Sequence, residues 1–154
     1  MFKGKKTRKS KEKKFQRGLD KLSLWVLKKK FDLEFDYCVQ DEFRSDNRCI
    51  TISTRQGLEN QLYSLLHECG HLLLNKNENS YAKKYPSSSK MLHYNSNKLL
   101  ERSARYKVDV LSEEIDAWRK GKELANRLKI EIDEEKFYSV MTECVYSYIT
   151  ALAR

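Results

Sequence analysis

One run of residues constrains the fold of this chain more than any other, because its apolar side chains recur at intervals of three and four. The run extends from Leu58 to Leu74, and this spacing places its leucines on one face of an α-helix. We predict a largely buried helix that follows Gly57 and ends near Asn75. Its most apolar part contains the sequence His67-Glu68-Cys69-Gly70-His71, whose polar side chains need partners when they are buried.

The two histidines of this sequence are four residues apart, so they project from the same side of a helix. His67 and His71 are therefore predicted to bind one Zn²⁺ ion through their imidazole nitrogens. Glu68 lies at the edge of the same face, where it can reach a zinc-bound water and act as the general base. Gly70 costs about 1 kcal/mol relative to alanine inside a helix. This cost indicates that either close packing or the approach of a substrate requires a residue without a side chain there.

Catalytic zinc usually takes a third protein ligand, and helix periodicity favours Glu114 for that role. Glu114 shares a predicted helix face with apolar residues such as Trp118, whereas Glu113 shares its face with Asp116 and Lys120. We therefore expect Glu114 to point into the core and Glu113 to point away from it. A carboxylate that faces a core needs a partner, which either the metal or a buried Lys or Arg can supply.

A histidine elsewhere in the chain is the other candidate for completing the site. The metzincin class has a third histidine six residues after the second, and Asn77 at that position excludes this class. His93 remains as an alternative ligand or as a hydrogen-bond donor to the developing oxyanion. Three tyrosines can donate to the oxyanion as well, and the sequence does not choose among them: Tyr81, Tyr94 and Tyr106.

A second motif joins the first in a recognisable pair. Residues 65–71 read Leu-Leu-His-Glu-Cys-Gly-His, and residues 114–121 read Glu-Ile-Asp-Ala-Trp-Arg-Lys-Gly. With these two motifs the sequence resembles the zincin metallopeptidases of the ImmA/IrrE type, a family that includes small proteins of phages and prophages. The resemblance covers roughly residues 48–150, and it does not extend to the polar stretch 75–97 or to the basic N-terminal residues.

The resemblance implies a function as well as a fold. It implies Zn²⁺ held by His67, His71 and Glu114, and hydrolysis of a peptide bond with Glu68 as the general base. It also implies that the strand at residues 49–53 borders the cleft, where a peptide could add as an antiparallel strand. Proteases of the Spartan type, which cleave DNA-bound proteins, use a third histidine after the motif, but His93 lies farther downstream than that pattern expects.

The other segments predict a mostly helical α+β domain of residues 15–154. Helices are expected at about 14–30, at 98–128 with an interruption near Asp109, and after Asp133, which is expected to cap the last one. Alternating apolar residues at 33–39 and the short run at 49–53 flank a turn-rich stretch, which predicts a small antiparallel β-hairpin beside the motif helix. Residues 75–97 show no sustained period and contain Pro86, so we expect a loop or lid.

Charge is unevenly distributed along the chain. Residues 1–30 hold 13 Lys or Arg and two acidic residues, so their net charge is +11, whereas the rest of the chain has a net charge of −2. Residues 1–14 are therefore predicted to form a basic, disordered arm that either binds nucleic acid or another polyanion, or only aids solubility. No apolar stretch is long enough for a membrane span or a signal peptide.

The four cysteines show no CxxC spacing and are expected to be reduced thiols in a cytoplasmic protein. Three functions remain open at this point. The first is a zinc metallopeptidase, including a Spartan-like protease acting on DNA-bound proteins. The second is a nucleic-acid-associated binding protein with a structural or vestigial zinc site. The third is a zinc hydrolase whose substrate is a non-peptide amide.

Overall fold

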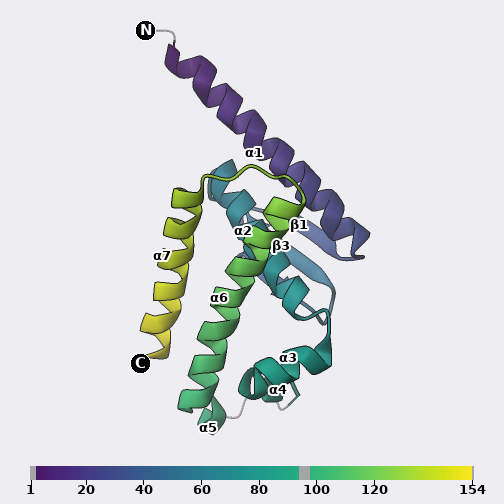
Figure 1. The fold of residues 1–154 in the computed structure, drawn as a ribbon, viewed down its shortest axis with the longest axis vertical. Helices are drawn as coiled ribbons and strands as arrows, with labels where there is room; N and C mark the ends of the chain where they lie inside the picture. The colour runs from purple at the N-terminus through teal and green to yellow at the C-terminus, as the bar shows by residue number, and fades with distance from the viewer. Residues whose placement is uncertain (1–2, 94–97, 154) are drawn as a thin grey trace.

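Helices dominate the structure, and a small sheet lies against them, which confirms the predicted α+β class (Figure 1). The computed structural model describes the backbone of residues 3–93 and 98–153 and the side chains of residues 8–90 and 98–153. The elements follow one another in this order: α1 (Lys3–Lys28), β1 (Asp32–Asp36), β2 (Glu42–Arg44), β3 (Cys49–Ser53), α2 (Leu58–Leu74), α3 (Glu78–Lys84), α4 (Pro86–His93), α5 (Lys98–Glu101), α6 (Ala104–Arg127) and α7 (Glu134–Leu152).

The sheet is mixed, which corrects the prediction of a simple antiparallel hairpin. Its strand order is β1-β3-β2, and β3 is paired on both sides. β1 runs parallel to β3 with Leu33 opposite Ile50, whereas β2 runs antiparallel to β3 with Phe43 opposite Ile50. The predicted turn does lead into β3, but the strand before it is the short β2. The hairpin partner was missed because three residues are too few to show an alternating pattern.

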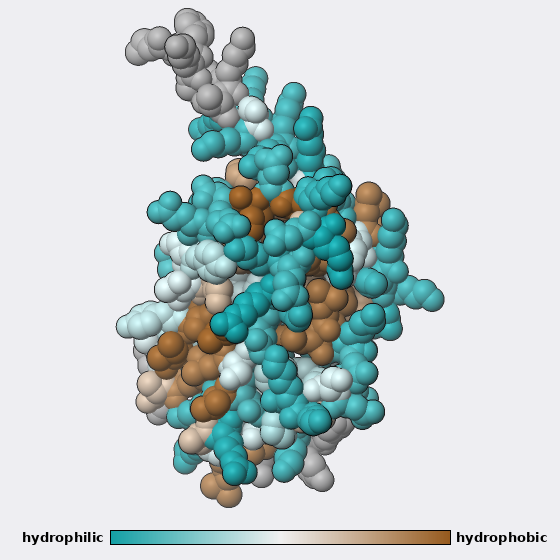
Figure 2. All heavy atoms as spheres, viewed as in Figure 1, coloured by the Kyte–Doolittle hydropathy of each residue, from teal (hydrophilic) through white to brown (hydrophobic). Residues whose placement is uncertain are grey.

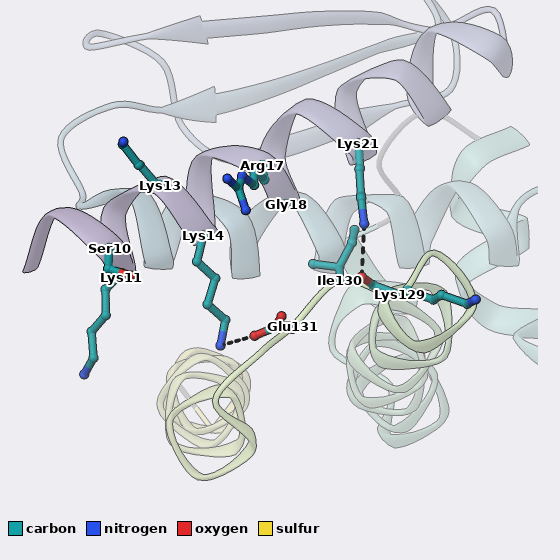
Figure 3. A pocket seen from close by; sticks show the side chains of 10 residues that line it. All are labelled: Ser10, Lys11, Lys13, Lys14, Arg17, Gly18, Lys21, Lys129, Ile130 and Glu131. Atoms are coloured by element: carbon teal, nitrogen blue, oxygen red, sulfur yellow. Dashed lines mark hydrogen bonds and ion pairs between the residues drawn. The ribbon is translucent and has the colours of Figure 1, made fainter. Parts of the chain in front are cut away.

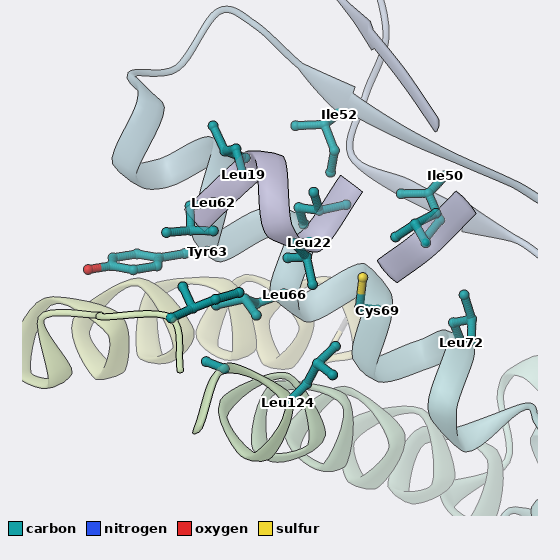
Figure 4. Packing of buried hydrophobic residues seen from close by; sticks show 14 of the residues in the cluster. Leu19, Leu22, Ile50, Ile52, Leu62, Tyr63, Leu66, Cys69, Leu72 and Leu124 are labelled. Atoms are coloured by element: carbon teal, nitrogen blue, oxygen red, sulfur yellow. The ribbon is translucent and has the colours of Figure 1, made fainter. Parts of the chain in front are cut away.

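The hydrophobic core surrounds α2, whose predicted bounds are confirmed by a Gly57 N-cap and an Asn75 C-cap. α1 and the sheet cover one side of α2, and α6 and α7 cover the other (Figures 1 and 4). Almost every residue from Gln61 to Leu72 is buried, because neighbours pack on this helix from all sides. The fully buried side chains that meet around α2 include Leu22 and Val26 of α1, Ile50 and Ile52 of β3, and Leu124 of α6.

α2 and α6 cross at very short range, and two glycines make this possible. A Cβ atom at Gly70 would lie 2.6 Å from the carbonyl carbon of Ala117, and one at Gly121 would lie 2.7 Å from the carbonyl carbon of Leu66. Real Cβ atoms do not approach other atoms so closely. Gly70 therefore permits close helix packing, one of the two explanations expected from the sequence. The crossing brings the backbone of α6 directly against the motif.

The stretch predicted to be a loop or lid contains two short helices, α3 and α4. Asn77 caps α3 by accepting a hydrogen bond from the Ser80 backbone, and Asp109 of α6 accepts one from the Ser87 backbone at the start of α4. The side chain of Tyr81 is buried against α6. The periodicity was not visible because a helix of seven or eight residues presents only two turns. The action of this segment as a lid stays a prediction.

Three helix boundaries test the sequence analysis; two differ from the prediction and one agrees with it. α1 begins at Lys3, so the described part of the predicted arm is helical rather than disordered. The break in the 98–128 helix falls at residues 102–103, where Ser103 caps α6, and not near Asp109. Asp133 caps α7 by accepting a hydrogen bond from the Lys136 backbone, as predicted.

All four cysteines are free thiols, also as predicted. No helix in the described ranges is long and apolar enough to cross a bilayer.

Candidate metal centre

Three buried side chains from two helices converge on one point. His67 and His71 extend from successive turns of α2, and Glu114 extends toward them from α6. The Nε2 atoms of the two histidines are 3.3 Å apart. Glu114 Oε2 lies 3.1 Å from His67 Nε2, and Glu114 Oε1 lies 3.4 Å from His71 Nε2. The inward orientation expected for Glu114 is thus confirmed, and the close crossing of α2 and α6 produces it.

The donor atoms have the spacing that a single metal ion requires. Ligands about 2.0–2.1 Å from a tetrahedral zinc ion are roughly 3.3 Å from one another, and the three observed separations lie close to this value. Glu114 Oε2 is fully buried, and apart from its ion-pair contact with His67 it has no hydrogen bond to any residue that the structure describes. A buried carboxylate oxygen of this kind needs a hydrogen-bond donor or a cation as its partner. The triad can therefore hold one metal ion.

Charge in the triad is strongly coupled. Burial alone would raise the pKa of Glu114, but the adjacent His67 and His71 lower it to about 2. Burial alone would lower the pKa of His71, but the carboxylates of Glu113 and Glu114 raise it to about 10. Without a metal ion, the site therefore consists of a carboxylate stabilised by a protonated imidazole. A cation that binds here replaces that proton as the partner of the carboxylate.

Glu68 lies beside the triad but does not belong to it. Its Oε1 atom is 3.9 Å from His67 Nε2, and its side chain is buried. Burial raises the pKa of Glu68, an effect that the two imidazoles oppose and that Glu114 reinforces. A carboxylate with a raised pKa next to a metal site is a stronger base than an ordinary glutamate and is suited to accept a proton there.

Glu113 is closer to the site than its position on α6 suggested. The sequence predicts that it points away from the core, but its Oε1 atom lies 3.4 Å from Nδ1 of His71. Its Oε2 atom accepts a hydrogen bond of 2.8 Å from the hydroxyl of Tyr81 on α3. The prediction was wrong because a glutamate is long enough to reach sideways from the edge of a helix face. Its two partners, His71 and Tyr81, lie on α2 and α3, so the contacts depend on how these helices pack against α6.

Aromatic rings hold both histidines in place. Trp118 of α6 stacks on His67 with ring centroids 4.5 Å apart and planes inclined by 20°. Phe43 of β2 lies nearly parallel to His71, with centroids 6.4 Å apart and planes inclined by 8°. These contacts restrict the rotation of the imidazoles, so the spacing between the donor atoms is set by packing as well as by charge.

The triad opens into a cleft of about 260 Å³. Its walls come from β2 and the residues on either side of β2, from α2, α3 and α6, and from the distal half of α7. The strand implied by the resemblance, β3, contributes no lining residue, because it is the central strand and β2 separates it from the cleft. The lining residues are Asp41, Glu42, Phe43, Ser45, His67, Glu68, His71, Asn75, Tyr81, Glu113, Glu114 and Tyr148.

A comparison with protein families identifies a family whose sequence model matches this chain. The model of the IrrE N-terminal-like domain, peptidase family M78, matches residues 19–106, which is more than half of the chain. The chain belongs to this family. Membership in the M78 family indicates a metallopeptidase, and the resemblance seen in the sequence is confirmed. No curated protein and no solved structure matches the chain.

The M78 match includes His67, Glu68 and His71 but ends before Glu114. The assignment of Glu114 as the third member of the triad therefore rests on the structure, in which α6 places its carboxylate against both histidines. The match also includes α3 and α4, so the segment that seemed to depart from the resemblance lies inside the M78 domain.

The sequence also suggested one histidine and three tyrosines as oxyanion donors, and the structure places only some of them. Tyr81 lines the cleft, but its hydroxyl donates to Glu113; Tyr106 is not among the lining residues. Tyr94 and the side chain of His93 lie outside the described residues. The sequence analysis missed Tyr148 of α7, which lines the cleft near Glu114. Its position on the inward face of the last helix was the available signal.

Proposed function

We propose that this protein is a zinc-dependent metallopeptidase that hydrolyses peptide bonds with Glu68 as the general base. The observation that carries this proposal is the buried triad of His67, His71 and Glu114 with the Glu68 carboxylate beside it. Membership in the M78 family supports a peptidase. The donor set supports zinc, because two imidazoles and one carboxylate are typical ligands of catalytic zinc.

The triad would hold one Zn²⁺ ion, with each histidine contributing Nε2. Bound there, zinc would supply Lewis-acid chemistry, polarising a carbonyl group and making water easier to deprotonate. Glu113 and Tyr81 would not bind the metal but would position one of its ligands, His71. Glu113 accepts the Nδ1 proton of His71, which leaves the Nε2 lone pair free for the metal, and the Tyr81 hydroxyl orients Glu113.

Glu68 would move the proton during hydrolysis. Its carboxylate takes a proton from the attacking water and delivers it to the nitrogen of the leaving amine. The hydroxyl of Tyr148, which lines the same cleft from α7, would donate a hydrogen bond to the oxyanion that forms from the carbonyl group. Burial raises the pKa of the Tyr148 hydroxyl, and Glu114 raises it further, so this group remains protonated and able to donate.

The sheet edge supports a peptide as the substrate. β2 pairs with β3 on one side only, and residues of β2 line the cleft. An extended peptide could therefore pair with the second edge of β2 and lie across the cleft with its backbone hydrogen-bonded. This arrangement favours an endopeptidase over a hydrolase of small non-peptide amides.

Three forms of the protein test the proposal: wild type, Glu68→Gln and Glu114→Ala. We expect wild type and Glu68→Gln to contain one equivalent of zinc by elemental analysis, and only wild type to cleave a mixed peptide library. Glu114→Ala should lose most of the zinc. Zinc in wild type without cleavage of any peptide or protein would instead support a structural site, and hydrolysis of non-peptide amides alone would support the third function.

A further inference from the structure

A second cavity lies on the side of the molecule formed by α1, and its lining is strongly basic (Figure 3). This basic groove has a volume of about 430 Å³ and lies between α1 and the loop that joins α6 to α7. Glu131 is the only acidic side chain among the described residues that line it. Its six cationic residues are Lys11, Lys13, Lys14, Arg17, Lys21 and Lys129.

Tertiary contacts shape the groove. α1 packs tightly on the body at Gly18, where a Cβ atom would lie 3.0 Å from a methyl group of Leu62 and 3.1 Å from one of Ile130. Lys129 adopts a positive φ of 52°, which turns the chain after α6. The Lys21 ammonium donates a hydrogen bond of 3.2 Å to the carbonyl of Lys129 (Figure 3). Two segments that are 108 residues apart thus present their charges together.

Most of this positive charge has no internal counter-charge. Lys14 forms an ion pair of 2.9 Å with Glu131. Within the described part of the chain, Lys11, Arg17 and Lys129 form no ion pair with an acidic side chain. The rest of the protein cannot balance the charge either, because residues 31–154 have a net charge of only −2 against +11 for residues 1–30. Like charges held together in this way repel one another, so the groove favours an anionic partner.

The charge continues along α1 beyond the groove. Residues 8–14 read Arg-Lys-Ser-Lys-Glu-Lys-Lys, and nearly all of them are exposed. This part of α1 extends past the body of the molecule, and hydrophilic side chains cover it (Figures 1 and 2). The groove and the exposed turns of α1 together form one continuous basic surface.

We propose that this basic surface binds the phosphate backbone of double-stranded DNA without reading its sequence. A helix with cations on all sides can enter the wide major groove of B-form DNA, whereas the major groove of duplex RNA is too narrow. Among the residues that the structure describes, no aromatic side chain lines the basic groove, so these residues offer no stacking platform for single-stranded bases. Residues 8–14 contain no apolar side chain that could insert into a membrane.

The DNA surface and the metal centre are separate sites. The basic groove and the metal cleft share no lining residue. DNA bound along α1 would therefore leave the cleft accessible to a protein substrate. The DNA surface is built from α1 and the loop between α6 and α7 and contains no residue of the metal centre, so DNA binding is expected whether or not that centre is catalytic.

Fluorescence anisotropy with a labelled DNA duplex tests the proposal, using salt concentrations from about 50 to 200 mM. The groove variant is Lys11→Gln/Arg17→Gln/Lys129→Gln. The matched control, Lys76→Gln/Lys83→Gln/Lys90→Gln, removes the same charge from exposed positions in and near α3 and α4. We expect the groove variant to bind at least about tenfold more weakly and the slope of log affinity against log salt to decrease by roughly 2.7, three phosphates at about 0.9 each. The control should bind like wild type.

Several results would overturn the proposal. An equal loss in both variants would mean that only net charge matters. Single-stranded DNA, duplex RNA or phosphatidylserine vesicles binding as tightly as duplex DNA would assign the surface to another partner. Circular dichroism checks that each variant is folded. If the groove variant is not, Lys9→Gln/Lys13→Gln replaces it, because both side chains are exposed on α1; an unchanged DNA affinity in that variant would count against the proposal.

Discussion

Glu113 on α6 lies against the far side of the His71 ring from the other donor atoms of the metal centre. Its Oε1 atom is 3.4 Å from His71 Nδ1, whereas His71 Nε2 faces Glu114. The two adjacent glutamates thus contact the two nitrogens of one imidazole. Tyr81 of α3 fixes the first of them through a hydrogen bond of 2.8 Å. Glu114 is therefore placed to bind the metal and Glu113 to orient His71, and mutations of the two residues should have different effects.

We expect Glu113→Gln to weaken metal binding without abolishing it. Removing a carboxylate that orients a histidine ligand typically costs about 10- to 100-fold in metal affinity. Tyr81→Phe should produce a smaller loss, because it only releases Glu113. Competition with a chromophoric chelator measures both, and Glu123→Gln on the exposed side of α6 is the control. Unchanged affinity in Glu113→Gln would show that Glu113 does not position His71.

The helix crossing predicts the effect of adding one methyl group. Gly121→Ala should lower the free energy of unfolding by about 1–3 kcal/mol, because the new Cβ would overlap the backbone of Leu66. Helix propensity alone predicts the opposite sign, a gain of about 1 kcal/mol. Urea denaturation distinguishes the two. Gly57→Ala is the control, since a Cβ there meets nothing within 4 Å; because Gly57 is the N-cap of α2, this variant should lose no more than about 1 kcal/mol, through the cap alone.

The contact between α3 and α6 predicts a dependence of stability on pH. Asp116 accepts a hydrogen bond of 2.7 Å from Tyr85 and forms an ion pair of 2.8 Å with Lys84. Partial burial raises the pKa of Asp116, but these partners outweigh it and lower the pKa below its usual value. The stabilisation is therefore fully present above the pKa of the unfolded chain and is lost as pH falls through the lower folded pKa.

Asp116→Asn should accordingly lower the free energy of unfolding by about 1–3 kcal/mol near neutral pH, and the difference from wild type should shrink as the solution becomes acidic. Urea denaturation at a series of pH values measures this difference. A difference that stays constant from neutral to acid pH would mean that the ionised carboxylate contributes nothing specific.

Tyr148 offers a test of the proposed oxyanion donor. Tyr148→Phe should lower kcat by about 100-fold while the zinc content stays at one equivalent, because the hydroxyl lies outside the triad. Tyr146→Phe, an exposed position on the same helix, is the control and should be active. Loss of zinc in Tyr148→Phe, or full activity, would contradict the assignment.

The sequence alone determined the motif helix, its bounds and the orientation of Glu114. Each of these follows from the period of one helix: His67 and His71 are four residues apart, and Glu114 shares a face with Trp118. Helix period is a local property, so it can be read without knowing the fold. The N-cap at Asp133 was visible for the same reason.

Only the tertiary structure decided what these elements contact. Periodicity can place Tyr148 on the inward face of α7, but it cannot place Tyr148 or Glu113 in the site, because their partners lie on other helices. The parallel pairing of β1 with β3 and the docking of α3 through Tyr81 likewise depend on contacts between distant segments. Side-chain reach and helix crossing distances are properties of the packed molecule. The chain therefore specifies the metal ligands locally, and packing around Gly70 and Gly121 brings them together.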